Sequence, residues 1–264
     1  MPAPVVSGYA PVNGLQMYYE RHGAGRPLVL VHGGFGFTGM FAALIPGLAA
    51  GREVIAVELQ GHGRTADVDR PFSFEQFGDD VAALIQHLGL APADLLGYSL
   101  GGGAAWQAAL RHPPAVRRLA VISAPAQRQG WYPEDLAGMG ALTVAGLSAT
   151  PLYPLYQSLA PHPEAWPRLV EKTRALLGQD YDWTAALAGL RQPVLVAAGD
   201  ADGLPPEYLA ALWRRVGGGR AAGFVSEFRR AQLALLPGTT HLDILSRADL
   251  LLPILTSFLD TPAA

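Results

Sequence analysis

A serine between two glycines stands in the segment most suited to chemistry, Gly97-Tyr98-Ser99-Leu100-Gly101. A short apolar run precedes this segment, and a run of small residues typical of a helix follows it. The pattern G-x-S-x-G between a strand and a helix predicts a nucleophilic serine whose hydroxyl projects from a strained turn. Positions two before and two after the serine crowd other backbone, which explains the glycines. The alternative is a glycine-rich helix start in which Ser99 is only an N-cap.

A serine hydroxyl becomes an effective nucleophile when a base takes its proton, and seven histidines are candidates for that base. His241 follows the last predicted strand, so we expect it at the carboxyl edge of the sheet, where Ser99 also emerges. The order Ser, Asp, His along the chain favours the same choice. His32 and His62 lie in glycine-rich loops after strands and are candidates to line a pocket. The other four stand at predicted turns, at helix ends or between prolines.

The acid that orients the histidine must lie in a loop beside His241. Two aspartates, Asp200 and Asp202, follow the apolar run 193–198. The preceding strand ends in Ser123-Ala124-Pro125 and offers no acid. Asp and Gly also favour turns, and the residue pattern alone does not choose between the two aspartates.

The oxyanion formed by attack on a carbonyl needs two preorganised N–H donors. The backbone N–H of Leu100, the residue after the nucleophile, is expected to be one of these donors. The second is expected from the glycine-rich loop 32–36, His32-Gly33-Gly34-Phe35-Gly36, because glycines allow backbone to approach a ligand oxygen. The alternative for this loop is an ordinary strand-to-helix turn.

Strands and helices alternate along the chain, which predicts an α/β fold with a mostly parallel central sheet and helices on both faces. An Asn13-Gly14 pair between two β-prone runs predicts an N-terminal hairpin. Strands are expected at 5–12, 15–20, 28–31, 54–59, 94–96, 119–123, 193–198 and 232–236, and helices at 74–88, 102–111, 206–216 and 247–259.

The rhythm changes between residues 127 and 192, where prolines and aromatics are frequent and no strand is evident. We therefore predict a core domain formed by residues 1–126 and 193–264, with residues 127–192 inserted as a helical cap. Residues 136–160 carry no charge, but their apolar runs are short and broken by prolines. That pattern favours an apolar cap over a membrane-spanning helix.

Composition narrows the possible partners and cofactors. The chain of 264 residues has a net charge of −3 and no basic tract, so no nucleic-acid partner is expected. It has no cysteine, which excludes disulfides, thiolate catalysis and cysteine-based metal sites. The first fourteen residues do not resemble a signal peptide, so a cytoplasmic location is expected. The sequence leaves open whether the chain forms a homo-oligomer.

The motifs resemble the α/β-hydrolase superfamily, in the branch of lactonases, esterases, C–C bond hydrolases and cofactor-free haloperoxidases. The matching segments are LVLVHGGFG (28–36), VELQGHGRT (57–65), LLGYSLGGGAA (95–105), PVLVAAGDADGLPP (193–206) and LLPGTTH (235–241). The resemblance implies the α/β-hydrolase fold with its inserted cap. It implies Asp202 as the acid, the fourth position of G-x-x-D, and the N–H groups of Gly34 and Leu100, rather than Phe35, as oxyanion donors.

The chain also departs from the superfamily's pattern. Glu58 and Gln60 stand where relatives often carry Asp and Arg, in a loop that supports the site from below. Residues 217–219 and 221–230 lengthen the approach to the last strand, and we expect a surface loop there.

These features predict a serine hydrolase that cleaves a carboxylic ester or lactone of a small apolar or aromatic substrate through an acyl-enzyme, with no metal or organic cofactor. Alternatives are C–C bond hydrolysis or perhydrolase and haloperoxidase chemistry on the same three residues, and a non-catalytic protein that keeps the fold to bind a ligand.

Overall fold

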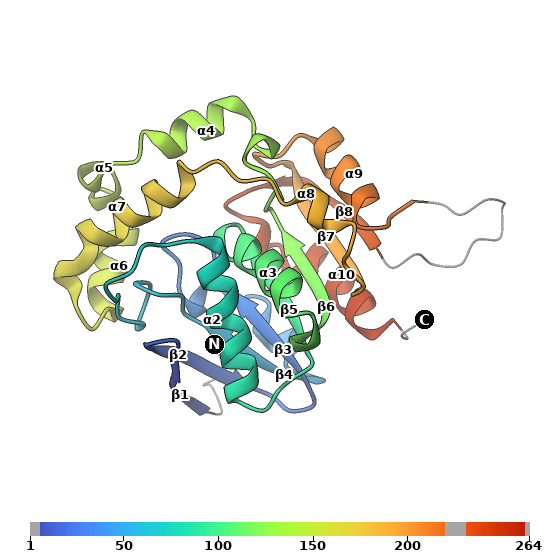
Figure 1. Ribbon diagram of the computed structural model, residues 1–264, viewed down its shortest axis with the longest axis horizontal. Helices are drawn as coiled ribbons and strands as arrows, with labels where there is room; N and C mark the ends of the chain where they lie inside the picture. The colour runs from blue at the N-terminus through green and yellow to red at the C-terminus, as the bar shows by residue number, and fades with distance from the viewer. Residues whose placement is uncertain (1–5, 220–230, 262–264) are drawn as a thin grey trace.

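A single eight-stranded sheet forms the centre of the computed structural model, which describes residues 6–219 and 231–261 (Figure 1). Its spatial order is β1-β2-β4-β3-β5-β6-β7-β8. The strands are β1 (Val6–Val12), β2 (Leu15–His22), β3 (Arg26–Val31), β4 (Arg52–Val57), β5 (Ala93–Tyr98), β6 (Val116–Ile122), β7 (Val194–Ala201) and β8 (Ala231–Thr240).

The first two strands are the antiparallel part of the sheet. They form the expected hairpin, and both turn residues, Asn13 and Gly14, adopt positive φ (46° and 82°) as an Asn-Gly turn requires. Strand β2 then pairs antiparallel with β4. All pairings from β4 through β8 are parallel, which aligns the carboxyl ends of these strands at one edge.

The central strands are buried on both faces, and alternate residues serve two separate cores. Val29 and Val31 of β3 pack into the core under α2 (Phe74–His87), α3 (Leu100–Arg111) and α9 (Pro206–Arg215). Leu28 and Leu30 of the same strand pack into the core under α1 (Ile45–Leu48) and α10 (Ala248–Asp260). This two-sided burial explains why the strand reads as a continuous apolar run, and it confirms the predicted α/β class.

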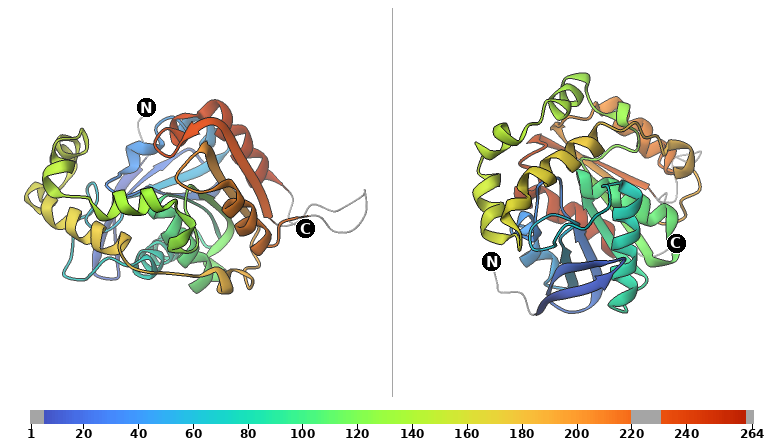
Figure 2. Two further views of the ribbon diagram at one scale, coloured as in Figure 1. Left: turned by 90° about the horizontal axis from the view of Figure 1, so that it is seen from above. Right: turned by 60° about the vertical axis from the view of Figure 1, so that its left-hand side comes forward.

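Five α-helices connect β6 to β7. The first four gather over one end of the molecule, and the fifth lies beside α9 (Figures 1 and 2). The two ends of this segment pair with each other: Trp183 N–H donates to Ala126 O at 2.8 Å, and Arg128 N–H donates to Tyr181 O at 2.9 Å. The predicted boundaries of the cap, 127 and 192, stay a prediction. The helices are α4 (Pro133–Gly140), α5 (Val144–Ser148), α6 (Leu152–Leu159), α7 (Trp166–Leu177) and α8 (Thr184–Leu187).

Two cations fasten α7 to the core. Lys172 on α7 is the only lysine of the chain. Its Nζ donates to both carboxylate oxygens of Asp67 (2.8 and 2.9 Å) and to the carbonyl oxygens of Val68 (3.0 Å) and Arg70 (2.8 Å). Arg168, one turn earlier on α7, also pairs with Asp67 at 2.7 Å. The contacts join α7 to the loop that follows β4.

Observed element boundaries differ from the predicted ones by a few residues. The largest difference is β8, which continues to Thr240 instead of ending at 236, because it stays paired with β7 past the bulge near Gly199. Residues 221–230, predicted as part of a surface loop, lie outside the described residues. Among the helices of residues 6–219 and 231–261, none is long and apolar enough to cross a membrane.

Candidate active site

Ser99 occupies a strained turn between β5 and α3, with φ 53° and ψ −120°. The two flanking glycines are required by space. A Cβ atom on Gly97 would lie 2.2 Å from the Gly101 carbonyl oxygen, and one on Gly101 would lie 2.3 Å from that of Val31. The predicted reason for the G-x-S-x-G spacing is therefore met in the structure, and Ser99 makes no side-chain cap of α3.

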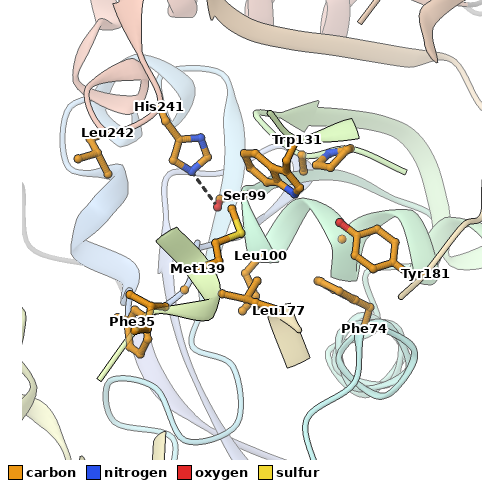
Figure 3. Close-up of a pocket in the computed structure, with 15 residues that line it drawn as sticks. Phe35, Phe74, Ser99, Leu100, Trp131, Met139, Leu177, Tyr181, His241 and Leu242 are labelled. Carbon is orange, nitrogen blue, oxygen red and sulfur yellow. Dashed lines mark hydrogen bonds between the residues drawn. The ribbon is translucent and has the colours of Figure 1, made fainter. Parts of the chain in front are cut away.

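Three side chains from distant parts of the chain meet at this turn. Ser99 Oγ lies 3.0 Å from His241 Nε2 (Figure 3), and His241 Nδ1 lies 2.9 Å from Asp202 Oδ1. The Asp202 carboxylate can only accept from Nδ1–H, so Nε2 carries the lone pair and accepts the Ser99 proton. The arrangement can move a proton away from the serine hydroxyl, as nucleophilic attack requires.

Asp202 is held by more than its histidine. Its Oδ1 also accepts from Gly203 N–H at 2.7 Å, and its Oδ2 accepts from the Ser123 hydroxyl. Burial by itself raises the pKa of Asp202, but these hydrogen bonds and the neighbouring imidazole outweigh it and hold the pKa below its usual range. The carboxylate therefore stays ionised at neutral pH and can stabilise an imidazolium.

Asp200 accepts a hydrogen bond from a backbone amide and not from the histidine. Its Oδ1 accepts from Thr239 N–H at 3.2 Å, and its side chain is exposed. The two aspartates that the residue pattern left undecided are thus separated by geometry. Asp202 reaches the imidazole, while Asp200 fastens the β7 and β8 ends together.

His241 is positioned from two further sides. Tyr98, next to the nucleophile, donates its hydroxyl to the His241 carbonyl oxygen at 2.7 Å. The Trp131 ring meets the imidazole edge-on, with 5.4 Å between ring centroids and a 70° interplanar angle. These contacts fix both the backbone and the ring plane of the histidine.

The two predicted oxyanion donors flank the serine. Gly34 and Leu100 both line the cavity that contains Ser99. Leu100 is the first residue of α3, so its N–H has no partner within the helix. The loop of Gly34 lies close to the nucleophile, since a Cβ on Gly33 would come within 3.2 Å of the Ser99 Cβ. Their role as donors stays a prediction.

His32 and His62 do not line this cavity, contrary to the expectation from their loops. Both side chains are fully buried, with 5.1 Å between ring centroids. His32 accepts from Leu59 N–H (3.1 Å) and donates to Gly33 O (2.7 Å), so it links the two loops under the site. Burial lowers the pKa of His32 to about 3 and that of His62 to about 4. Both are neutral structural residues.

Glu58 and Gln60, which stand where relatives often carry Asp and Arg, form hydrogen bonds with nearby residues. Glu58 is fully buried and accepts from Thr38 N–H (3.2 Å) and from Arg64 Nη1 (2.7 Å). Gln60 donates to Asp67 (2.7 Å) and accepts from Arg70 Nε (2.6 Å). The loop beneath the site is therefore supported by a different set of hydrogen bonds.

An apolar cavity of about 270 Å³ opens at Ser99 (Figure 3). No charged side chain lines it within the described residues, and its side-chain polar groups are those of Ser99, His241, Trp131 and Tyr181. The same part of the chain contains no cluster of three His, Asp or Glu side chains able to hold a metal. The lining residues are Gly34, Phe35, Phe74, Ser99, Leu100, Gly103, Ala124, Pro125, Trp131, Met139, Leu142, Leu177, Tyr181, His241 and Leu242.

Two contributors to the site, Ser123 and Tyr181, are not among the predicted site residues. Ser123 was considered only as a position without an acid, yet its hydroxyl bonds Asp202. Its place at the end of the strand beside β7 was the available signal. Tyr181 was assigned to the cap with other aromatics, and its place in the cavity depends on the pairing of residues 126–128 with 181–183, which no local pattern shows.

The sequence model of the family described as alpha/beta hydrolase fold matches residues 26–166, more than half of the chain. The chain belongs to the α/β-hydrolase fold family. This α/β hydrolase is 28% identical over 227 residues to a protein of Azorhizobium caulinodans described as a carbamate hydrolase, RutD. That match covers 77% of the chain and 84% of the relative.

Two other similarities are more limited. A pimeloyl-[acyl-carrier protein] methyl ester esterase of Neisseria meningitidis is 42% identical over 114 residues, 42% of this α/β hydrolase and 43% of the relative. The chain thus spans less than half the length of that esterase. The solved meta-cleavage product hydrolase CumD from Pseudomonas fluorescens IP01 superposes with a TM-score of 0.76 at 19% identity, over 97% of this chain and 98% of CumD. That similarity shows the fold.

The two buried histidines predict acid sensitivity of this α/β hydrolase. In the unfolded chain a histidine titrates near pH 6.5, whereas the folded pKa values are about 3 and about 4. Between these pH limits the unfolded state binds more protons than the folded state, so the free energy of unfolding falls as the pH falls. We expect each histidine to contribute up to about 1.4 kcal/mol per pH unit between about pH 6 and pH 4.

Urea unfolding at several pH values measures this slope. His62→Gln should flatten it, while His87→Gln, at an exposed position on α2, should leave it unchanged. An unchanged slope in His62→Gln would contradict the assignment.

The separate roles of the two aspartates predict different mutant kinetics. Asp202→Asn removes the carboxylate that fixes the imidazole tautomer, and we expect kcat for a p-nitrophenyl ester to fall by about 10⁴. Asp200→Asn keeps an oxygen for Thr239 N–H, and we expect kcat to stay within a few-fold of wild type. Circular dichroism checks that both variants are folded. Comparable losses in the two variants would count against Asp202 as the acid.

Proposed function

We propose that this protein is a serine hydrolase that cleaves a carboxylic ester or lactone of a small, uncharged apolar or aromatic substrate through an acyl-enzyme. The observation that carries the proposal is the hydrogen-bonded series Ser99–His241–Asp202, which opens directly into an apolar cavity. A hydroxyl beside a base, with the base oriented by a buried carboxylate, is the arrangement that activates serine for acyl transfer.

In the proposed reaction, His241 Nε2 takes the Ser99 proton as Oγ attacks the substrate carbonyl carbon. The N–H groups of Gly34 and Leu100 would stabilise the tetrahedral oxyanion, and the positive end of α3 adds to that field. His241 then donates the proton to the leaving alkoxide oxygen, which leaves the acyl group on Ser99. Water, deprotonated by His241, attacks the acyl-enzyme, and the same two donors stabilise the second oxyanion. The bond between the acyl carbon and Ser99 Oγ then breaks, His241 returns the proton to Oγ, and the carboxylic acid leaves.

The lining of the cavity supports an uncharged substrate. An ionised group placed against the apolar side chains around Ser99 would lose its hydration without gaining a partner, since no lysine or arginine lines the cavity in the described residues. A volume of about 270 Å³ suits a small acyl or alkyl body. Phe35, Phe74 and Trp131 supply surfaces on which apolar or aromatic groups pack.

The rival functions are separated by simple assays. C–C bond hydrolysis on the same residues predicts turnover of vinylogous diketones in preference to esters. A protein that only binds a ligand predicts no covalent reaction at Ser99. The strained backbone at Ser99 favours chemistry over binding alone, because such strain persists where function maintains it.

The shared proton transfer predicts non-additive mutants. Ser99→Ala and His241→Ala should each lower kcat for p-nitrophenyl butyrate by about 10⁴ or more, because neither residue catalyses without the other. The double variant should be little slower than either single variant. A fluorophosphonate probe should label wild type at Ser99 and should not label Ser99→Ala. Additive losses in kcat, or labelling that survives Ser99→Ala, would refute the proposed mechanism.

A further inference from the structure

Tyr181 is a polar group of the cavity that the proposed reaction does not use. It lines the same space as Ser99, across from His241 and beside Phe74 (Figure 3). Figure 3 shows its hydroxyl pointing to the interior of the cavity on the side of Trp131. A hydroxyl among apolar side chains needs a hydrogen-bonding partner, because a buried unsatisfied polar group is costly.

The position of Tyr181 is fixed by both its backbone and its ring. Its carbonyl oxygen accepts from Arg128 N–H at 2.9 Å, where the two ends of the inserted segment pair. The ring stacks on Trp183, with 4.6 Å between centroids, and meets Phe74 edge-on at 5.1 Å. The hydroxyl is therefore held at one place in the cavity before any ligand binds, as specific recognition requires.

The Tyr181 hydroxyl accepts a hydrogen bond, and its own proton stays available to be donated to a ligand. The Trp131 side chain donates to the phenolic oxygen and thereby lowers the pKa of Tyr181, but burial is the larger cause and raises the pKa to about 12. The phenol consequently keeps its proton at neutral pH. Across residues 6–219 and 231–261, no acceptor forms a hydrogen bond with that O–H, and the cavity lies in front of it.

We propose that the Tyr181 hydroxyl donates a hydrogen bond to a second, uncharged oxygen of the substrate, a ketone, ether or hydroxyl oxygen several bonds from the carbonyl that Ser99 attacks. The inference rests on the proposed ester or lactone hydrolysis and narrows its substrate class to oxygen-bearing neutral esters and lactones. A neutral donor in a cavity without lysine or arginine selects a neutral acceptor. Analogues that lack the second oxygen forgo this hydrogen bond, so we expect the enzyme to turn them over less efficiently.

Matched ester pairs test this assignment. One set compares p-nitrophenyl hexanoate with its 4-oxo and 5-oxo derivatives, so that the second oxygen lies in the acyl chain. A second set compares hexyl acetate with 4-oxohexyl and 5-oxohexyl acetate, so that the second oxygen lies in the alcohol part of the ester. Turnover of this set is measured by pH-stat. For wild type we expect kcat/KM to be higher for at least one oxo ester than for its unsubstituted partner.

Tyr181→Phe removes only the hydroxyl. We expect this variant to lower the ratio of kcat/KM for the preferred oxo ester to kcat/KM for its unsubstituted partner by about 3- to 10-fold. Tyr153→Phe is the matched control, because it removes a hydroxyl from α6 that bonds Gln157 and does not line the cavity. It should leave both substrates unaffected.

Two results would overturn the assignment: no oxo ester preferred by wild type, or equal effects of Tyr181→Phe on both members of the preferred pair. Either result is distinguishable from failure of the proposed hydrolysis. Fluorophosphonate labelling at Ser99 and turnover of unsubstituted esters by the wild-type protein test that hydrolysis separately.

Discussion

The backbone conformation of Ser99 is the constraint on which the site depends. A non-glycine residue at φ 53° and ψ −120° costs about 1–3 kcal/mol, so the surroundings must hold it. Ser99 N–H donates to Ile122 O at 2.9 Å, and Ser99 O accepts from Gly102 N–H at 2.8 Å. The close approach of Gly97 to Gly101 leaves no room for the chain to relax. The doubly buried parallel sheet supplies the stability that offsets this strain.

The same edge of the sheet brings the partners of the serine into reach. Strands β5, β6 and β7 are neighbours and parallel, so the loops after them begin side by side. Ser123 after β6 also adopts positive φ, 54°, and its hydroxyl bonds the Asp202 carboxylate after β7. A neutral donor there leaves the charge of the acid intact while fixing its orientation. The position of the His241 imidazole is thus set by residues after three neighbouring strands, β5, β6 and β7, together with the loop after β8.

Much of this site could be predicted from sequence because its requirements are local. The glycines around Ser99 and the apolar run before it express steric needs within a few residues, and His241 follows from the order of the strands. The choice of Asp202 over Asp200 came from a family resemblance, since two aspartates two residues apart on one turn differ only in where the turn directs them. The structure supplies that direction.

Other parts depend on contacts between distant segments and left no local pattern. The position of Tyr181 requires the pairing of the two ends of the inserted segment. The glycine-rich loops suggested a pocket role for His32 and His62, but the packing of the β3 and β4 loops against each other buries both rings. Lys172 reads as an ordinary helical cation, and its four acceptors lie about a hundred residues earlier in the chain.

We expect Ser99 to deliver a nucleophile into a cavity already arranged for a tetrahedral oxyanion. A crystal structure of the protein after reaction with an alkyl phosphonate ester tests it most directly. We expect a phosphorus–oxygen bond to Ser99 Oγ, with the phosphonyl oxygen about 2.7–3.1 Å from the backbone nitrogens of Gly34 and Leu100. His241 should still be bonded to Asp202. An adduct at another residue, or a phosphonyl oxygen turned away from both nitrogens, would contradict it.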